Sequence, residues 1–199
     1  MVAVKKLPKE DYYTYSDYLS WETDARYELI NGVAYALASP SPKHQRIIGK
    51  LYSQFESHLR GKKCEVFLSP LDVRLNYDTK DDTVVQPDLF VVCDKNKIDD
   101  KGCKGAPDLM IEVLSQSNRS WDLLVKYNRY LEAGVPEYWV VDPDARLVHV
   151  FILKDENFIA KNYGDDAMIS SVVLPDCQID MTQVFEPVQE IENKKRGPF

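Results

Sequence analysis

Two carboxylates lie inside apolar stretches of this sequence, where an ionised side chain is costly to bury. Asp88 falls within the apolar residues 84–92, and Glu112 falls within the apolar residues 109–114. Strands that are apolar at nearly every position are covered on both faces, so an ionised carboxylate there needs a cation or hydrogen-bond donors. Carboxylates, water and substrate phosphate are the ligands that Mg²⁺ prefers. The pair therefore predicts a site for Mg²⁺ or Mn²⁺.

A structural role for the same two acids remains open. Each acid would then pair with a buried arginine or lysine, or Asp88 would cap a turn after Pro87. Structural ion pairs perturb carboxylates just as functional sites do. For either acid alone the two interpretations are balanced, and the presence of both together favours the metal site.

Three further residues are candidates for the same site. Lys126 lies at the border of the apolar face of a helix expected over residues 118–133, although an i, i+4 pair with Asp122 is the simpler interpretation. Glu28 precedes a predicted turn and is either a third acid or the polar face of an edge strand. His44 is predicted to point inward at the start of a helix. An inward histidine is more often a core or capping residue, but we expect His44 to border the acids and to contact substrate or a metal-bound water.

A basic stripe is the candidate contact for nucleic acid. Between residues 43 and 63 the sequence has six Lys or Arg and one acid, and Lys43, Arg46 and Lys50 share one side of the predicted helix. Binding to phosphates depends largely on such cations. The net charge of −7 counts against a strong nonspecific nucleic-acid binder. A solvated helix face is the alternative for the stripe.

The elements that must position these residues alternate between helices and strands. Asn31-Gly32 between apolar stretches is a strong hairpin signal. The order of elements predicts an α/β or α+β domain with a mixed central sheet. Helices are expected over residues 14–22, 43–60 and 118–133, and strands over residues 65–68, 72–77, 84–92, 109–114, 137–141, 147–153 and 158–163.

Length and composition set the outer limits. The 199 residues suit one domain, expected over residues 1–189, with a polar tail at 190–199. No apolar run is long enough for a membrane helix, and the N-terminus has no apolar signal core. The four cysteines form no Cys-x-x-Cys pair, so neither zinc nor a disulfide framework is expected. A reduced cytoplasm is the simplest compartment.

Several blocks of the sequence resemble the Uma-two family of restriction-endonuclease-like proteins. The resemblance covers about residues 10–185 and is most specific in a long block that begins at Pro107 and continues through Asp122, Lys126 and Tyr130 to Pro143. The blocks are YELING at 27–32, PSPKH at 40–44, PDLFVV at 87–92, PDLMIEVLSQS at 107–117 and GVPEYWVVDP at 134–143.

The resemblance implies a restriction-endonuclease-like fold of the PD-(D/E)XK nuclease superfamily. Such a fold has a four-stranded mixed core sheet flanked by helices and supports metal-dependent hydrolysis of phosphodiester bonds. Position by position, Asp88 and Glu112 match the two metal-binding acids, and Glu28 matches the acid of the first core element. The usual lysine, two residues after the second acid, is replaced here by Leu114. Lys126 on the following helix is its expected substitute.

Two functions from different classes follow. The first is a Mg²⁺-dependent endonuclease acting on nucleic acid, with DNA as the expected substrate. The second is an inactive module of the same fold that binds nucleic acid or a protein partner, which the acidic charge and the displaced lysine favour. A small-molecule enzyme ranks last because no cofactor motif is present. A homodimer is expected by analogy with the superfamily alone.

Overall fold

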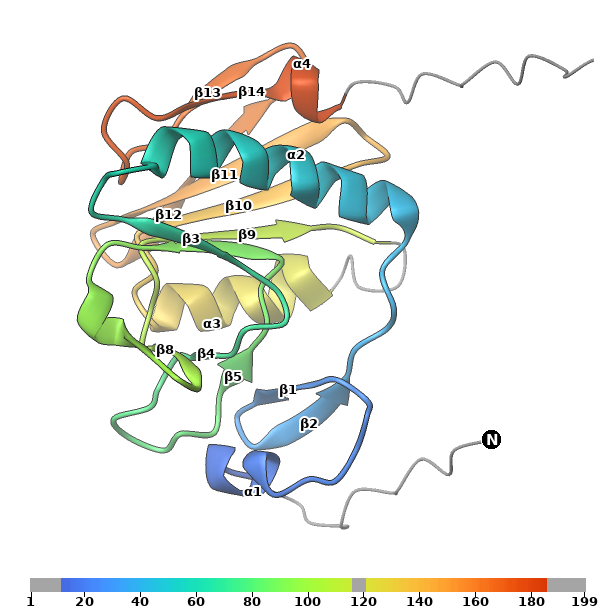
Figure 1. Ribbon diagram of the computed structural model, residues 1–199, viewed down its shortest axis with the longest axis vertical. Helices are drawn as coiled ribbons and strands as arrows, with labels where there is room; N and C mark the ends of the chain where they lie inside the picture. Colours follow the sequence, from blue (N-terminus) through green and yellow to red (C-terminus); the bar gives the residue numbers. More distant parts are fainter. Residues whose placement is uncertain (1–11, 116–120, 186–199) are drawn as a thin grey trace, which may run out of the picture.

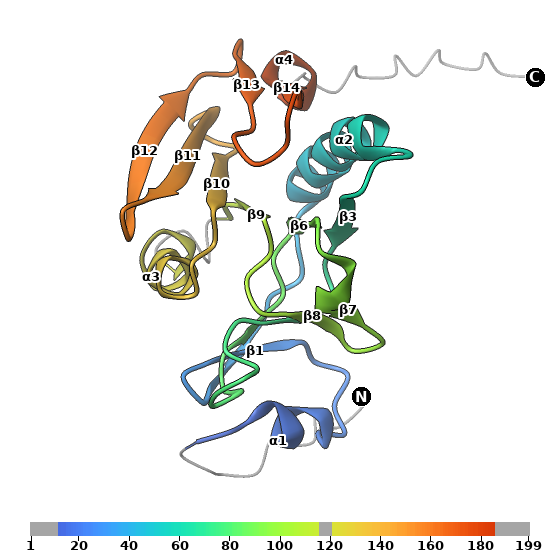
Figure 2. The same cartoon turned by 90° about the vertical axis from the view of Figure 1, so that its left-hand side faces the viewer.

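The central sheet is built from the most apolar stretches of the chain. In the computed structural model, which describes residues 12–115 and 121–185, its strand order is β12-β11-β10-β9-β6-β3 (Figures 1 and 2). Strands β9 and β10 run parallel and all other neighbours run antiparallel, so the sheet is mixed, as predicted. Its strands are β3 (Glu65–Leu68), β6 (Leu89–Val92), β9 (Leu109–Val113), β10 (Glu137–Asp142), β11 (Leu147–Lys154) and β12 (Asn157–Tyr163).

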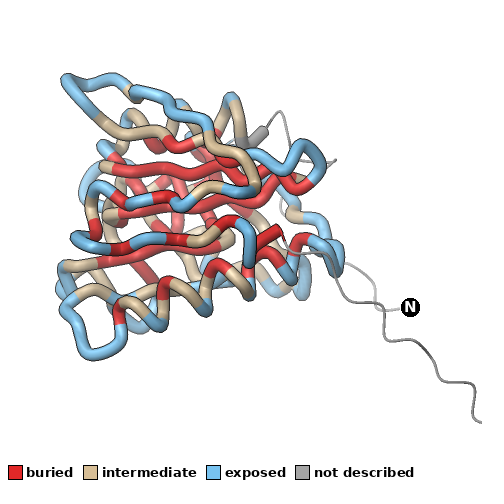
Figure 3. The backbone as a smooth tube through the Cα atoms, turned by 90° about the horizontal axis from the view of Figure 1, so that it is seen from above, coloured by how far each residue is buried: buried red, intermediate tan, exposed pale blue. Residues whose placement is uncertain are grey.

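Two helices cover opposite faces of this sheet (Figures 1 and 2). Helix α2 (Pro42–Leu59) begins after Ser41, whose hydroxyl accepts a hydrogen bond from the His44 amide. Helix α3 (Tyr127–Glu132) follows a π-helical turn, η2 (Trp121–Lys126). Because side chains alternate along a strand, Ile111 packs on the α2 side and Met110 on the α3 side. The central strands are therefore buried along most of their length (Figure 3).

A second sheet is formed by strands from residues 27–36 and 73–104. Its order is β2-β1-β5-β4-β8-β7, and it is joined to the central sheet through residues 86–88, between β5 and β6. Asn31 and Gly32 both have positive φ, at 50° and 78°, as the predicted two-residue hairpin requires. Its elements are β1 (Tyr27–Ile30), β2 (Val33–Ala36), β4 (Val73–Arg74), β5 (Val84–Val85), β7 (Ile98–Asp99) and β8 (Gly102–Lys104).

Several predicted boundaries were wrong. The stretch 84–92 is two strands in different sheets, because Pro87 provides no amide for a ladder and the chain changes sheet there. The strand expected over 72–77 is only β4. The first helix, α1 (Tyr15–Leu19), ends three residues early, and Asn118 lies outside the described residues, as does the tail at 190–199. Sequence patterns also missed η1 (Lys95–Lys97), β7, β8, β13 (Met168–Ser170), β14 (Gln178–Asp180) and α4 (Met181–Val184).

One cysteine pair corrects the expectation from cysteine spacing. Cys64 and Cys93 form a disulfide, although they are 29 residues apart in the sequence. The antiparallel register of β3 and β6 pairs Glu65 with Val92, which places the two cysteines opposite each other. The spacing of the cysteines along the chain could not predict this disulfide, because strand register brings the two residues together. Separately, no helix in the described part of the chain is both long and apolar enough to cross a membrane.

Candidate active site

The two predicted acids face each other at one end of the central sheet. The register of β6 and β9 pairs Leu89 with Ile111, and its continuation places Asp88 opposite Glu112. The Asp88 carboxylate accepts a hydrogen bond of 2.8 Å from the Val113 amide. Both acids line one cavity of about 880 Å³. The two acids therefore lie on the same side of neighbouring strands, as one shared cation would require.

Lys126 lies between two carboxylates. Its ammonium nitrogen is 2.9 Å from Glu112 Oε1 and 2.9 Å from Glu28 Oε1, and the residue is 3% exposed. Lys126 is the last residue of the π-helical turn, an irregularity that is frequent at functional sites. The simpler interpretation, in which Lys126 pairs only with Asp122 at the helix surface, is therefore wrong. The side chain of Asp122 is not among those that the structure describes.

Glu28 brings the second sheet to the site. It lies in β1, between β2 and β5, and is fully buried, so it is not the polar face of an edge strand. Its Oε1 atom accepts hydrogen bonds from the Gln86 amide at 2.9 Å and from Lys126. Its Oε2 atom is buried and has no hydrogen-bond partner among the described residues. An unmet buried carboxylate oxygen is costly, so a further donor or cation near this oxygen would stabilise it.

His44 borders the acid cluster, as expected. It lies in the first turn of α2, and its Nε2 atom is 3.1 Å from Asp88 Oδ2. The ring is buried while Asp88 keeps a partly exposed edge toward the cavity. The predicted contact of His44 with substrate or with metal-bound water remains a prediction.

Tyr130 is a site residue that the sequence analysis missed. Its hydroxyl donates a 2.6 Å hydrogen bond to Glu112 Oε1, the oxygen that also contacts Lys126. Burial, followed by the charges of Glu112 and Glu28, raises the pKa of Tyr130 well above its usual value, so the phenol stays a donor. The available signal was the i, i+4 spacing of Tyr130 from Lys126, which places the two side chains on the same side of a helix.

Comparisons with known proteins show the family of this chain. The family described as "Putative restriction endonuclease", Uma2, matches residues 15–182. This chain belongs to the Uma2 family. An uncharacterized protein of Synechocystis sp. (strain ATCC 27184 / PCC 6803 / Kazusa) is 33% identical over 116 residues, which span 57% of this chain and 60% of that relative.

A solved structure supports the fold of this Uma2 member. It is titled as a putative nuclease belonging to DUF820 from Anabaena variabilis ATCC 29413, and the two share 21% sequence identity. The match has a TM-score of 0.71 and covers 87% of this chain and 97% of that chain. At this identity the likeness establishes the nuclease-like fold alone, and the chemistry of the Uma2 site has to be argued from its residues.

The basic stripe of this Uma2 member divides in two. Lys43 lines the cavity and forms a 2.7 Å ion pair with Asp144, with both side chains exposed. Arg46 and Lys50 are not among the residues that line the cavity. Only the first residue of the predicted nucleic-acid stripe therefore lies at the acid cluster.

The residues of the Uma2 site suit a hard divalent cation held by few protein ligands. Among the described residues, no set of three or more His, Cys, Asp or Glu is arranged as a metal-ligand cluster. Mg²⁺ is commonly held by one or two carboxylates, with water and substrate phosphate completing its shell. Asp88 and Glu112 on one cavity wall supply such a pair, and the unmet Oε2 of Glu28 adds negative potential beside it.

Proposed function

We propose that this chain is a Mg²⁺- or Mn²⁺-dependent endonuclease that hydrolyses phosphodiester bonds of DNA. The observation that carries the proposal is the convergence of Asp88, Glu112 and Lys126 on the wall of one cavity, from three separate segments. Convergence of two acids and a lysine is what metal-assisted phosphodiester hydrolysis needs. A homodimer is part of the proposal by analogy and is checked by light scattering.

The charge of the cluster supports a cation. Glu28 and Glu112 share one ammonium, that of Lys126, and Asp88 contacts the imidazole of His44. Buried like charges raise one another's free energy unless opposite charge is added. A divalent cation adds that charge where Asp88 and Glu112 face the cavity, which favours a metal site over an inert cluster.

Each side chain then has a role. A metal held by Asp88 and Glu112 supplies Lewis-acid polarisation and a more acidic bound water. The Lys126 ammonium, fixed by Glu28 and Glu112, orients the attacking water or offsets charge that develops on the phosphate. His44 holds the Asp88 carboxylate through Oδ2. Lys43, Arg46 and Lys50 are proposed to contact the nucleic-acid backbone along α2, with Lys43 nearest the cavity.

An inactive module of the same fold is the second candidate. The observation in its favour is that Lys126 already pairs with both Glu28 and Glu112, which is what a purely structural ion triad would show. In that case the protein would bind nucleic acid or a protein partner without cleavage. The two candidates differ in whether the folded state binds a divalent cation.

Melting curves with and without Mn²⁺ separate the two. A cation that binds only the folded state stabilises it by about 2.7 kcal/mol at 100 times its Kd, so the wild type should melt at a higher temperature in Mn²⁺ and should nick a supercoiled plasmid. Asp88→Asn should lose both effects and leave the metal-free protein as stable or slightly more stable, because like-charge repulsion falls.

Glu137→Gln is the matched control, since Glu137 is a fully buried acid of β10 that does not line the cavity. It should keep the Mn²⁺-dependent rise in melting temperature and the nicking activity. A wild type whose melting curve ignores the metal, together with a badly destabilised Asp88→Asn variant, would overturn the nuclease proposal in favour of the structural triad.

A further inference from the structure

Arg26 lies on the wall of the same cavity and has no part in the acid cluster. It immediately precedes β1, two residues before Glu28, and residues two apart in an extended chain point to the same side. The cavity is lined by Arg26 together with Asp88, Glu112 and Lys126. Arg26 is half-buried, so its guanidinium is partly removed from water.

The side-chain partners of Arg26 are neutral. Its Nε atom donates to Gln86 Oε1 at 2.9 Å, and its Nη2 atom donates to the hydroxyl of Ser69. Among the described cavity-lining residues, Lys43 pairs with Asp144 and Lys126 with two glutamates, whereas no ion pair to a carboxylate is formed by Arg26. A guanidinium is charged at every accessible pH. Arg26 therefore brings to the cavity a fixed positive charge that forms no ion pair with a carboxylate of the described residues.

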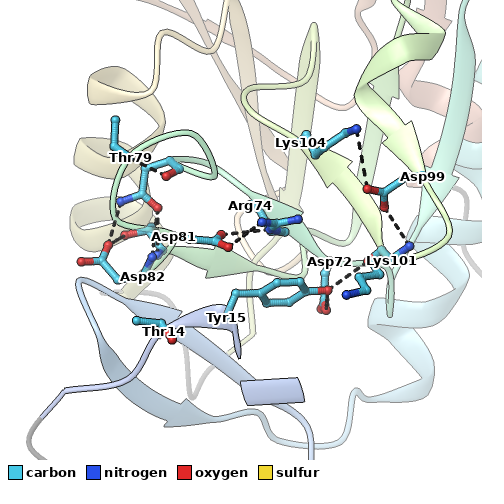
Figure 4. Close-up of polar contacts among 12 residues, drawn as sticks. Thr14, Tyr15, Asp72, Arg74, Thr79, Asp81, Asp82, Asp99, Lys101 and Lys104 are labelled. Atoms are coloured by element: carbon cyan, nitrogen blue, oxygen red, sulfur yellow. Dashed lines mark hydrogen bonds and ion pairs between the residues drawn. The ribbon is translucent and has the colours of Figure 1, made fainter. Parts of the chain in front are cut away.

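A hydrogen-bond network fixes the residue that holds Arg26. The amide nitrogen Nε2 of Gln86 donates to Asp72 Oδ1 at 3.0 Å and to the Tyr18 hydroxyl at 3.1 Å, which leaves Oε1 directed at Arg26. Asp72 also accepts hydrogen bonds from the hydroxyls of Tyr15, at 3.1 Å, and Tyr18, at 3.3 Å (Figure 4 shows the Tyr15 contact). Burial is the main cause of the raised pKa values of both tyrosines, so both remain donors at neutral pH.

A neighbouring arginine shows what a structural role looks like in this protein. Arg74 forms a two-point ion pair with Asp81, and its guanidinium lies 4.5 Å from the centre of the Tyr15 ring (Figure 4). Its charge is thereby matched within the protein. Arg26 differs because its hydrogen bonds orient the guanidinium without neutralising it. A preoriented, unmatched guanidinium suits the two-point recognition of a phosphate.

We propose that Arg26 is a phosphate-binding residue, which holds a backbone phosphate of a nucleic-acid strand at the β1 side of the acid cluster. The proposal rests on the proposed function for its choice of ligand. Gln86 links Arg26 to the acid cluster, because its backbone amide donates to Glu28 while its side chain accepts from Arg26. Gln86 thus fixes both Glu28 and the guanidinium proposed to hold the nucleic-acid strand.

Salt dependence of DNA binding tests the proposal directly. The probe is a fluorescein-labelled DNA duplex of mixed sequence, titrated with protein in EDTA at a series of KCl concentrations. Each phosphate neutralised by a side chain contributes about 0.9 to the slope of log K against log salt. Arg26→Gln should lower the magnitude of that slope by about 0.9 and weaken binding about 10- to 100-fold at low salt.

Two further variants make the result specific. Arg26→Lys keeps the charge and loses the planar fork, so it should keep the wild-type slope while binding about tenfold more weakly. Arg60→Gln removes an exposed cation that pairs with Glu56 at the far end of α2, and it should change neither quantity. Melting curves of all variants show whether each is folded, and Arg26→Lys keeps the test valid if Arg26→Gln is unstable.

The outcome separates this proposal from the nuclease proposal. If Arg26→Gln keeps the wild-type slope and affinity, or if the folded wild type binds no duplex even at low salt, Arg26 does not hold a backbone phosphate. If binding depends on Arg26 as described while the wild type nicks no plasmid with Mn²⁺, the phosphate site stands and the nuclease proposal fails.

Discussion

Glu112 and Glu137 are buried glutamates on the neighbouring strands β9 and β10, yet their surroundings differ. Glu137 is met by neutral donors: Trp139 Nε1 at 2.7 Å, Ser171 Oγ at 2.8 Å, and the amides of Val172 at 2.9 Å and Val173 at 3.2 Å. It lines no part of the cavity. Glu112 lies on the cavity wall and shares Lys126 with Glu28.

The difference teaches that burial of an acid in a strand does not by itself identify an active site. Glu137 anchors the segment that leads into β14, and its oxygens are occupied by groups of the fold. Glu112 belongs to a cluster with an excess of negative charge beside open space. Access to a cavity and charge that the protein leaves unmatched distinguish the candidate functional acid from the structural one.

The largest expected effect is on catalysis. Glu112→Gln should reduce plasmid nicking in Mn²⁺ by about 10³-fold or more, since it removes a proposed metal-binding carboxylate. Glu137→Gln should leave the nicking rate within about twofold when both are assayed well below their melting temperatures. Equal loss of activity in the two variants would show that the comparison between the two glutamates is mistaken.

Next in size is the effect of removing Lys126 on stability. Lys126→Met leaves Glu28 and Glu112 buried without their shared cation, so the free energy of unfolding should fall by roughly 3–5 kcal/mol. Urea denaturation measures it. Adding Glu28→Gln to Lys126→Met should restore part of the loss by removing one charge. Failure of the double variant to recover any stability would contradict the shared-cation description.

A smaller loss of stability is expected at the structural acid. In Glu137→Gln one carboxylate oxygen becomes an NH₂ group, which then faces the donors of either Trp139 or Ser171. Leaving buried donors unmet costs about 1–3 kcal/mol. Urea denaturation should show this decrease for Glu137→Gln. Glu112→Gln also removes like-charge repulsion from its cluster, so its free energy of unfolding should fall less than that of Glu137→Gln. A larger fall in Glu112→Gln would contradict the assignment of Glu137 as the structural acid.

The smallest expected effect is a local loosening near Glu137, which the reactivity of the Cys177 thiol measures. Burial, with a contribution from Glu137, raises the pKa of Cys177 to about 11, so only about 10⁻³ of this thiol is ionised at pH 8. Because the Ser171 amide donates to the carbonyl of Cys177, Glu137→Gln should loosen this segment. In this variant the Cys177 thiol should react with a disulfide reagent about tenfold faster than in wild type.

Two comparisons make the thiol experiment specific. Glu112→Gln should leave the rate at Cys177 unchanged, because Glu112 shares its face of β9 with Met110 on the α3 side, whereas Cys177 packs in the core on the α2 side. Cys103, whose pKa is raised to about 12 by burial in the second sheet, should react slowly in every variant. A thiol at Cys177 that reacts equally fast in wild type and Glu137→Gln would show that Glu137 does not anchor this segment.

Local patterns determined much of the fold. The Asn31-Gly32 hairpin, α2, β3 and β9 follow from turn chemistry and from hydrophobic periodicity, which act over a few residues. The pattern could not show that residues 84–92 divide between two sheets, since both halves are equally apolar. The residues alone also left Lys126 as an ordinary helix-surface lysine, and only the family resemblance placed it at the site.

The sequence by itself determined that Asp88 and Glu112 lie in apolar stretches, and the family resemblance implied that these two acids bind a metal. Tertiary structure alone decided that Glu28 and Lys126 meet Glu112, that Tyr130 joins them and that Cys64 pairs with Cys93. The physical reason is the sequence separation over which each kind of interaction acts. Turn and helix preferences are set by neighbours in the chain, whereas the charge balance of a buried carboxylate depends on groups brought close only by packing and strand register.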